Sequence, residues 1–431
     1  MTFDPRFARP ESLMMSYGYD PFLSEGAAKP PIFMTSTFVF KTAEEGEQYF
    51  KWAYGLEKRQ QTQSMGLIYS RLNNPSLQIL EERLALWDGA EAALTFASGM
   101  AAITTTVLAC VKPGDVLFYT MPIYGGTEFL FQHILPKFGI ETRPFAIDQP
   151  LEALEAEARE LGDRLAAFYL ETPANPTNMM IDIQGVAAIA ERLSTPEHRV
   201  LTIVDNTFLG PVFQHPLTLG ADAVLYSATK YIGGHSDVIA GAMTGRREVV
   251  EAVSTYRTIM GSMPDPFSCW LLLRSLETLK LRMEAQSKSA ERVARALAES
   301  SHVAEVLYPA LLPTDSPQYA IYRKQCAGPG AIVSFKVHGG KTEAFRFLNA
   351  VKLCKLAVSL GGTESLVEHP GTMTHSDIPR DVQERFGITE NLIRLSVGVE
   401  NTDDLLADLM QALELSQTDV VRNEAAYGSG I

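Results

Sequence analysis

The strongest constraint on the fold is an alternation of short apolar runs with helical patterns, which begins near residue 75. Four runs, DVLFYT, AAFYLE, LTIVDN and DAVLYS, are rich in β-branched and aromatic residues. Between them lie amphipathic stretches such as LEALEAEARELGDRL, and before them come a helical pattern ended by Asp-Gly (residues 77–89) and a strand and turn, AALTFASG. This alternation predicts a largely parallel sheet covered by helices.

The length of 431 residues favours two domains. Residues 1–65 are expected to form an irregular N-terminal arm, and residues 66–265 the α/β domain. A long helical stretch after residue 265 leads into a smaller α+β domain, residues 266–431, with strand candidates AIVSFKV and LIRLSVG and a helix near DDLLADLMQALEL. The polar tail, SQTDVVRNEAAYGSGI, is expected to be frayed.

Composition narrows the function class. A net charge of −14 argues against nucleic acid as the main partner, because phosphate binding needs clustered Lys and Arg. The longest uncharged run, residues 92–111, contains Ser, Thr and Gly and suits a strand, turn and buried helix better than a membrane span. Four dispersed cysteines and an N-terminus without a signal-peptide pattern favour the cytoplasm.

Chemically useful side chains follow the predicted strands, where ligands of such sheets bind. The segments after successive strands read ASGM, MPIYGGT, ETPANPTN, VDNT and SATK. They place an anion-binding turn, Tyr124, Asn175, Asp205, two hydroxyls (Ser227, Thr229) and Lys230 along one rim. A lysine in such a place is costly to bury unless its charge is used or suppressed.

Pyridoxal 5′-phosphate needs this combination. Its aldehyde needs a lysine amine, its ring nitrogen a carboxylate, its phosphate hydroxyls and a helix N-terminus, and its flat ring an aromatic neighbour. Each residue alone has an ordinary structural explanation, such as a turn, a cap or core packing. Their conjunction on successive strand ends predicts a pyridoxal-phosphate site.

The motifs ETPANPT, VDNT and SATKYIGGHSD together resemble the Cys/Met-metabolism family of pyridoxal-phosphate enzymes. That family includes cystathionine γ-synthase, cystathionine γ-lyase, methionine γ-lyase and O-acetylhomoserine sulfhydrylase. The resemblance spans about residues 30–415 and implies the fold type I of pyridoxal-phosphate-dependent transferases, with a mostly parallel large domain and a smaller α+β C-terminal domain.

The resemblance also implies roles for individual residues. Lys230 would bind the cofactor covalently and shuttle protons, and Tyr124 would stack on the ring and act as acid or base. The remaining matches are Asp205 for the ring nitrogen; Gly99, Met100, Ser227 and Thr229 for the phosphate; and Asn175, Ser359 and Arg394 for the substrate carboxylate.

In IYSRLNNPS, Tyr69 and Arg71 match a pair that reaches the phosphate site of a neighbouring subunit. The family resemblance therefore implies a homotetramer made of two active dimers. The expected partner is a small amino-acid substrate, without nucleic acid or membrane.

The expected reaction is γ-elimination from an L-amino acid such as methionine, homocysteine or a γ-oxy amino acid such as canavanine. Val358 precedes Ser359 where relatives that handle cystathionine tend to carry Glu, which favours an apolar γ-substituent. Gly126 stands where many bacterial methionine γ-lyases have Cys, which argues against a strict methionine lyase. The alternative is γ-replacement on an activated homoserine ester, as in O-acetylhomoserine sulfhydrylase or cystathionine γ-synthase.

The arm segment 46–67, with Trp52, Tyr54, Lys58 and Arg59, either shapes the substrate mouth or forms a surface loop.

Two rival classes find little support in the sequence. HGGKTEAF resembles part of a phosphate-binding P-loop, but Phe335 occupies the position of the required first glycine. The eight histidines are dispersed, and His369 and His375 lack a clear third ligand, so no metal is expected.

Overall fold

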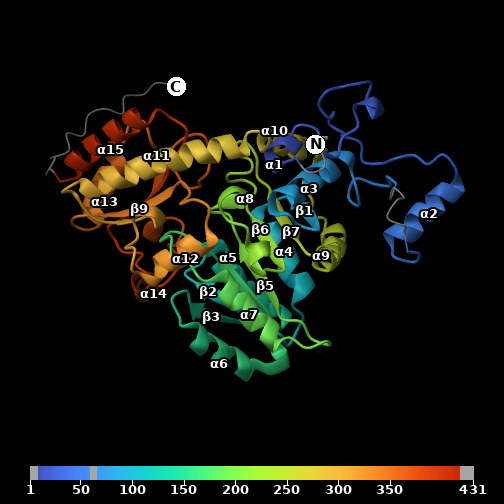
Figure 1. The fold of residues 1–431 in the computed structure, drawn as a ribbon, viewed down its shortest axis with the longest axis horizontal. Coiled ribbons are helices and arrows are strands. Elements are labelled where there is room, and N and C mark those ends of the chain that lie inside the picture. Colours follow the sequence, from blue (N-terminus) through green and yellow to red (C-terminus); the bar gives the residue numbers. More distant parts are fainter. Residues whose placement is uncertain (1–7, 59–65, 418–431) are drawn as a thin grey trace, which may run out of the picture.

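The computed structural model describes residues 8–58 and 66–417, and its centre is a seven-stranded sheet (Figure 1). In spatial order the strands are β1 (Ala92–Phe96), β7 (Gly241–Gly245), β6 (Ala223–Tyr226), β5 (Leu201–Asp205), β4 (Leu165–Glu171), β2 (Val116–Met121) and β3 (Glu141–Ala146). Strand β7 is antiparallel to both of its neighbours, and the other neighbouring pairs are parallel. The predicted largely parallel sheet is confirmed.

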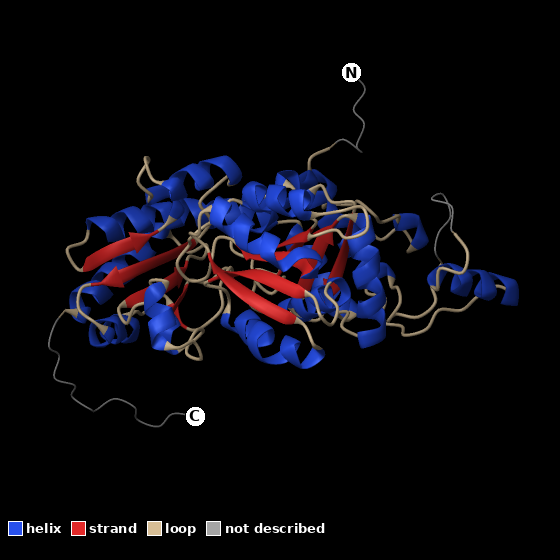
Figure 2. Cartoon of the chain, turned by 90° about the horizontal axis from the view of Figure 1, so that it is seen from below, coloured by secondary structure: helices blue, strands red, loops and turns tan. Residues whose placement is uncertain are grey.

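Helices cover both faces of this sheet (Figure 2). Alternate strand residues point to opposite faces, so Tyr169 of β4 packs in one cluster and Phe168 in the other. One cluster involves α4 (Gly99–Cys110), α9 (Arg247–Met260) and the π-helical turn Leu130–Ile134, which follows α5 (Gly125–Phe129). The other involves α6 (Leu151–Leu161) and α7 (Ile183–Leu193), while α3 (Pro75–Asp88) packs on β1 and β7.

The C-terminal part forms a five-stranded sheet with helices. Its strand order is β10 (Lys355–Leu356), β11 (Leu366–Glu368), β12 (Leu392–Ser396), β9 (Ile332–Val337) and β8 (Val303–Leu307). Its helices are α12 (Pro317–Gln325), α13 (Lys341–Ala350), α14 (Arg380–Arg385) and α15 (Thr402–Ser416). The expected smaller α+β domain is confirmed, while its boundary at residue 265 stays a prediction.

The long helical stretch after residue 265 is two helices, α10 (Pro266–Leu276) and α11 (Leu279–Glu299). The chain leaves helical geometry at Thr278, whose φ is −114° and whose ψ is 6°. The hydroxyl of Thr278 donates to the carbonyl of Ser275 at 3.3 Å, a local bond that competes with continued helix.

The N-terminal arm is less irregular than the sequence predicts, because it contains α1 (Pro10–Leu13) and α2 (Ala43–Ala53). Thr42 caps α2 by accepting from the backbone N–H of Glu45 at 3.1 Å. Helix α2 projects away from the body of the molecule (Figure 1). Arg59 of this arm and most of the predicted frayed tail lie outside the described residues.

Short elements complete the described chain. They are α8 (Gly210–Phe213), a π-helical turn (Leu130–Ile134) and six 3₁₀ turns (Pro21–Leu23, Leu135–Phe138, Gly162–Arg164, Pro216–Leu219, Pro309–Leu311 and Pro370–Thr372).

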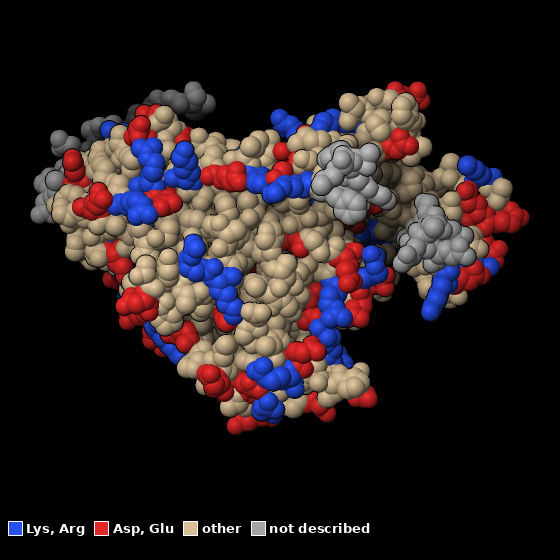
Figure 3. All heavy atoms as spheres, in the orientation of Figure 1, with Lys and Arg blue, Asp and Glu red and all other residues tan. Residues whose placement is uncertain are grey.

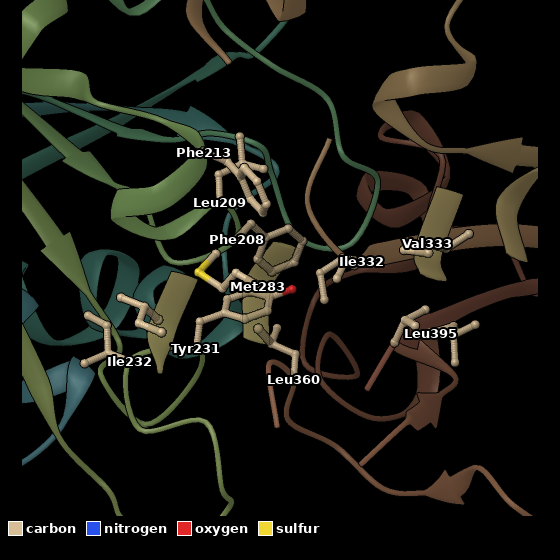
Figure 4. Close-up of a cluster of buried hydrophobic side chains, with 14 of the residues drawn as sticks. Phe208, Leu209, Phe213, Tyr231, Ile232, Met283, Ile332, Val333, Leu360 and Leu395 are labelled. Atoms are coloured by element: carbon tan, nitrogen blue, oxygen red, sulfur yellow. The ribbon is translucent and has the colours of Figure 1, made fainter. Parts of the chain in front are cut away.

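A continuous hydrophobic core joins the two domains (Figure 4). Phe208 and Tyr231 from the large domain lie near Met283 of α11, and Ile332 and Leu395 approach from the small sheet. Burying such a shared apolar surface fixes the relative position of the domains.

The surface carries charges of both signs. On the face drawn in Figure 3, Lys and Arg side chains alternate with Asp and Glu. Within residues 8–58 and 66–417, each helix is too short or too polar to cross a membrane.

Candidate active site

A cavity of about 310 Å³ lies beyond the carboxyl ends of the parallel strands and is closed by residues of the small domain. Ten of the predicted site residues line it: Gly99, Met100, Tyr124, Asn175, Asp205, Ser227, Thr229, Lys230, Ser359 and Arg394. The other lining residues are Ser98, Ile103, Glu171, Thr207, Phe208, Ile239, Val358, Leu360 and Thr374.

Lys230 extends from the loop after β6 toward the small domain. Its Nζ donates to Ser359 Oγ at 2.7 Å. Burial, helped by the positive charge of Arg394 and opposed by Glu368, lowers the pKa of Lys230 to about 8. A substantial fraction of this amine is therefore neutral near physiological pH, as a nucleophilic lysine requires.

Asp205 ends β5 and is held by hydroxyl and amide donors. Its Oδ1 accepts from Thr207 N at 3.0 Å and from Thr207 Oγ1 at 2.6 Å, and its Oδ2 accepts from the Tyr169 hydroxyl at 3.4 Å. Burial raises the pKa of Asp205, while these donors oppose the rise. The carboxylate is thus held in one orientation, and a cationic partner would stabilise its charged form.

One corner of the cavity is formed by the N-terminus of α4 and by the hydroxyls of Ser227 and Thr229 after β6. Ser98 caps α4 by accepting from Ala101 N at 3.0 Å, and Ser227 N donates to Thr207 Oγ1 at 2.9 Å. A Cβ placed on Gly99 would lie 2.9 Å from Ser227 Cβ, so only glycine allows this close approach. Backbone N–H groups of α4 and nearby hydroxyls make this corner suitable for an anion.

Tyr124 lies at the start of α5, lines the cavity and is 41% exposed. Its ring packs directly over Gly126, where an added Cβ would come within 2.7 Å of Tyr124 Cε1. Burial, followed by the negative charge of Glu171, raises the pKa of Tyr124.

Arg394 lies on β12 and is 2% exposed. Its Nη1 donates to Asn175 Oδ1 at 2.9 Å and lies 2.8 Å from Glu368 Oε1, and its Nη2 donates to Ser359 O at 2.8 Å. Ser359 has a φ of 93°, a region that non-glycine residues rarely adopt, and such strain is found mainly at functional sites.

Tyr69 and Arg71 do not enter this cavity. Arg71 Nη1 donates to the carbonyl of Thr258 at 2.7 Å, and the guanidinium lies 6.0 Å from the centre of the Tyr69 ring. Neither residue lines the site of its own chain, and their role in a neighbouring subunit stays a prediction.

Sequence reasoning missed two buried carboxylates next to the site. Glu171 is 5% exposed at the end of β4, and Glu368 is 1% exposed at the end of β11. Glu171 is the first residue of the ETPANPT motif, but a glutamate after a strand is usually exposed, so the pattern alone gives little signal.

His369 and His375 make hydrogen bonds with protein groups. The His369 ring contacts Thr372 Oγ1 and the Glu390 carbonyl, and the His375 ring contacts Thr374 Oγ1 and the Asn175 carbonyl. The described residues contain no group of three or more His, Cys, Asp or Glu suited to a metal ion.

The chain is similar to known proteins over nearly its whole length. The family described as Cys/Met metabolism PLP-dependent enzyme matches residues 11–414. L-methionine gamma-lyase of Pseudomonas putida is 40% identical over 402 residues, covering 93% of this chain and 96% of that protein. Cystathionine gamma-lyase of Homo sapiens is 37% identical over 414 residues, covering 96% and 95%.

A solved structure shows the same fold. The structure of cystathionine gamma synthase from Xanthomonas oryzae pv. oryzae, in complex with cystathionine, superposes with a TM-score of 0.84 at 33% identity. The match covers 95% of this chain and 98% of that one.

Proposed function

Because this chain belongs to the Cys/Met metabolism family of pyridoxal-phosphate-dependent enzymes, we propose that it is a γ-lyase for an L-amino acid with an apolar or γ-oxy substituent. Methionine, homocysteine and canavanine are the substrates that fit this description. Methionine and cystathionine γ-lyases among its relatives support γ-elimination at the level of the family.

The residues of the cavity fit pyridoxal 5′-phosphate. Lys230 would bind its aldehyde, Asp205 would keep its ring nitrogen protonated, and Tyr124 would stack on its ring. The corner opened by Gly99, with Met100, Ser227 and Thr229, would hold its phosphate. When bound, the cofactor supplies an electron sink for negative charge that develops at the substrate Cα.

The remaining groups would orient the substrate and move its protons. Arg394 offers a buried guanidinium to the α-carboxylate, and Asn175 and Ser359 fix that guanidinium in place. Lys230, with a pKa near 8, would carry protons between neighbouring carbons of the substrate. Tyr124 would donate a proton to the departing γ-group.

The main support for this choice of substrate is the apolar wall of the cavity, formed by Val358 and Ile239. Val358 and Ile239 both line the cavity and are 52% and 69% exposed, so they are free to contact a substrate side chain. An apolar wall favours a thioether or other uncharged γ-substituent over one that ends in a charged amino acid.

The alternative is γ-replacement on an activated homoserine ester. Its support is the close structural relation to a cystathionine gamma synthase. Elimination and replacement use the same protein groups. They differ in whether the activated substrate breaks down to 2-oxobutyrate and ammonia or a nucleophile adds at its Cγ.

We also propose a homotetramer of two active dimers in the cytoplasm. Among the described residues that line the cavity, the cationic side chains are Lys230 and Arg394, and both already have protein partners. A phosphate group would therefore benefit from Arg71 of a second copy, with Tyr69 beside it.

Product analysis by mass spectrometry tests the proposal. The purified enzyme would meet methionine, canavanine and O-acetylhomoserine separately, each with and without a thiol. Release of 2-oxobutyrate and ammonia without thiol supports elimination and identifies the leaving group. Products that keep the amino group, such as homoserine or a thiol adduct, would overturn elimination in favour of replacement.

A further inference from the structure

Glu171 joins the two loops that carry Tyr124 and Asn175. Its Oε2 accepts from the backbone N–H of Tyr124 at 2.9 Å, and its Oε1 accepts from the backbone N–H of Asn175 at 2.9 Å. The two loops follow different strands, β2 and β4, so Glu171 connects its own loop to a residue that lies 47 positions earlier in the sequence.

This carboxylate stands in an unfavourable place. Glu171 is the register partner of Asp205 on the neighbouring parallel strand, and both are buried. Burial and the charge of Asp205 raise the pKa of Glu171, whereas the two N–H donors and Arg394 oppose that rise. A second buried carboxylate beside Asp205 is costly, so it needs a compensating interaction, which the two N–H groups provide.

Asn175 is fixed at three atoms. Glu171 holds its backbone N–H, Arg394 Nη1 donates to its side-chain Oδ1 at 2.9 Å, and the His375 ring lies 3.2 Å from its carbonyl oxygen. Movement of this loop would therefore move an acceptor that orients Arg394.

Tyr124 depends on the same carboxylate at its backbone. Its ring rests on Gly126, and its side chain makes no capping hydrogen bond at the start of α5. The hydrogen bond from its backbone N–H to Glu171 therefore fixes the position of its backbone, from which the ring extends.

We propose that Glu171 is a positioning residue that sets the spacing between the Tyr124 ring and the Asn175–Arg394 carboxylate site. This inference rests on the proposed function for the roles of Tyr124 and Arg394. The geometry requires an acceptor oxygen at both positions, because two converging N–H groups donate to the two oxygens of Glu171. A glutamine would turn an NH₂ group toward one of the donors, whichever way the amide is oriented.

The first test measures amide hydrogen exchange in the holoenzyme without substrate. In Glu171→Gln, exchange at the backbone of Tyr124 or Asn175 is expected to rise about tenfold, the factor that corresponds to one hydrogen bond. In Glu171→Ala both amides are expected to exchange faster. The matched control is Thr142→Val on β3, which removes one side-chain-to-backbone hydrogen bond, from Thr142 Oγ1 to the Phe131 carbonyl at 2.9 Å, and involves neither Glu171 nor a residue that lines the cavity.

The second test is steady-state kinetics on the best substrate. Glu171→Gln is expected to raise KM and to lower kcat, each by about tenfold, since both the carboxylate site and Tyr124 lose their alignment. Thr142→Val is expected to leave both constants within about twofold of the wild-type values.

The possible results distinguish the positioning role of Glu171 from the proposed γ-lyase function. Unchanged exchange in both loops of Glu171→Gln, or faster exchange throughout β4 and β5 with unchanged KM, overturns the positioning role. A wild-type enzyme that forms neither an elimination nor a replacement product overturns the proposed function, and the exchange result still decides whether Glu171 positions the loops.

Discussion

The Lys230 amine and the Ser359 hydroxyl lie 2.7 Å apart, and this hydrogen bond connects the large domain to the small one at the centre of the site. A lysine that follows one sheet is thus oriented by a strained residue beside the other sheet.

Replacement of Lys230 is expected to abolish the reaction. Lys230→Ala should lower kcat by about 10³-fold or more, because it removes both the nucleophile and the proton carrier. The yellow absorption of the bound cofactor should also disappear. Lys341→Ala, a change at an exposed lysine on α13, is the matched control and should keep both colour and activity.

The rate at which cofactor-free protein captures pyridoxal 5′-phosphate should depend on pH. The neutral amine of Lys230 is the reactive form, so the rate should rise through pH 8, near its lowered pKa, and level off above it. In Arg394→Gln the midpoint should move to higher pH, because a neighbouring positive charge is removed. Absorbance-detected stopped flow over a pH series gives both midpoints, and a midpoint that stays unchanged in Arg394→Gln contradicts the assigned cause.

The ion pair between Arg394 and Glu368 should contribute strongly to stability. Glu368→Ala leaves a buried guanidinium without its carboxylate and should lower the free energy of unfolding by about 3 kcal/mol. The control is Arg292→Ala, which breaks an exposed pair with Asp403 and should cost less than about 1 kcal/mol. Urea denaturation measures both, and equal losses would argue against the buried pair.

The residue before Ser359 should influence substrate choice. Val358→Glu places a carboxylate in the apolar wall and should lower kcat/KM for an uncharged γ-substituent by about tenfold or more. Activity on cystathionine should rise relative to methionine, because the new carboxylate can pair with its distal ammonium group. Parallel kcat/KM measurements on the two substrates give the ratio, and an unchanged ratio would remove Val358 from the specificity argument.

Arg71 should act in a neighbouring subunit. Arg71→Ala should weaken cofactor binding, and Lys230→Ala should be inactive. Mixing and refolding the two variants together should restore activity, because some sites then combine Lys230 of one copy with Arg71 of another. Absence of restoration, with mixed oligomers present, would place Arg71 outside the shared site.

Much of the site could be predicted from sequence because its residues follow strands whose apolar character is clear. Lys230 and Asp205 come directly after such runs, and the carboxyl ends of parallel strands meet at one edge of the sheet. Ser359 and Arg394 were placed by family resemblance alone, since they lie in a different sheet whose packing no local pattern shows.

Strand β7 illustrates what the sequence hides. Its residues, GAMTG, have little of the usual strand character, and the reason lies in tertiary contact. A Cβ on Gly241 would lie 2.1 Å from the Ser98 carbonyl, and one on Gly245 would lie 2.6 Å from the Asp222 carbonyl. Glycine is required by these neighbours, so a pattern based on β propensity fails there.

The buried carboxylates Glu171 and Glu368 were missed for a related reason. Glutamate is normally exposed, and its burial is decided by partners distant in sequence, such as Tyr124 for the former and Arg394 for the latter.

The hydrophobic core around Met283 has a consequence for how the enzyme admits its substrate. Phe208 and Tyr231 share one hydrophobic core with Ile332 and Leu395 (Figure 4). A rotation of the C-terminal domain away from the large domain would therefore expose that core to water. We therefore expect substrate entry and exit to involve local rearrangement near Ile239 and Val358, the exposed apolar residues of the cavity lining, and the two domains to unfold together. Either domain produced alone would expose a large hydrophobic surface to water and is expected to aggregate.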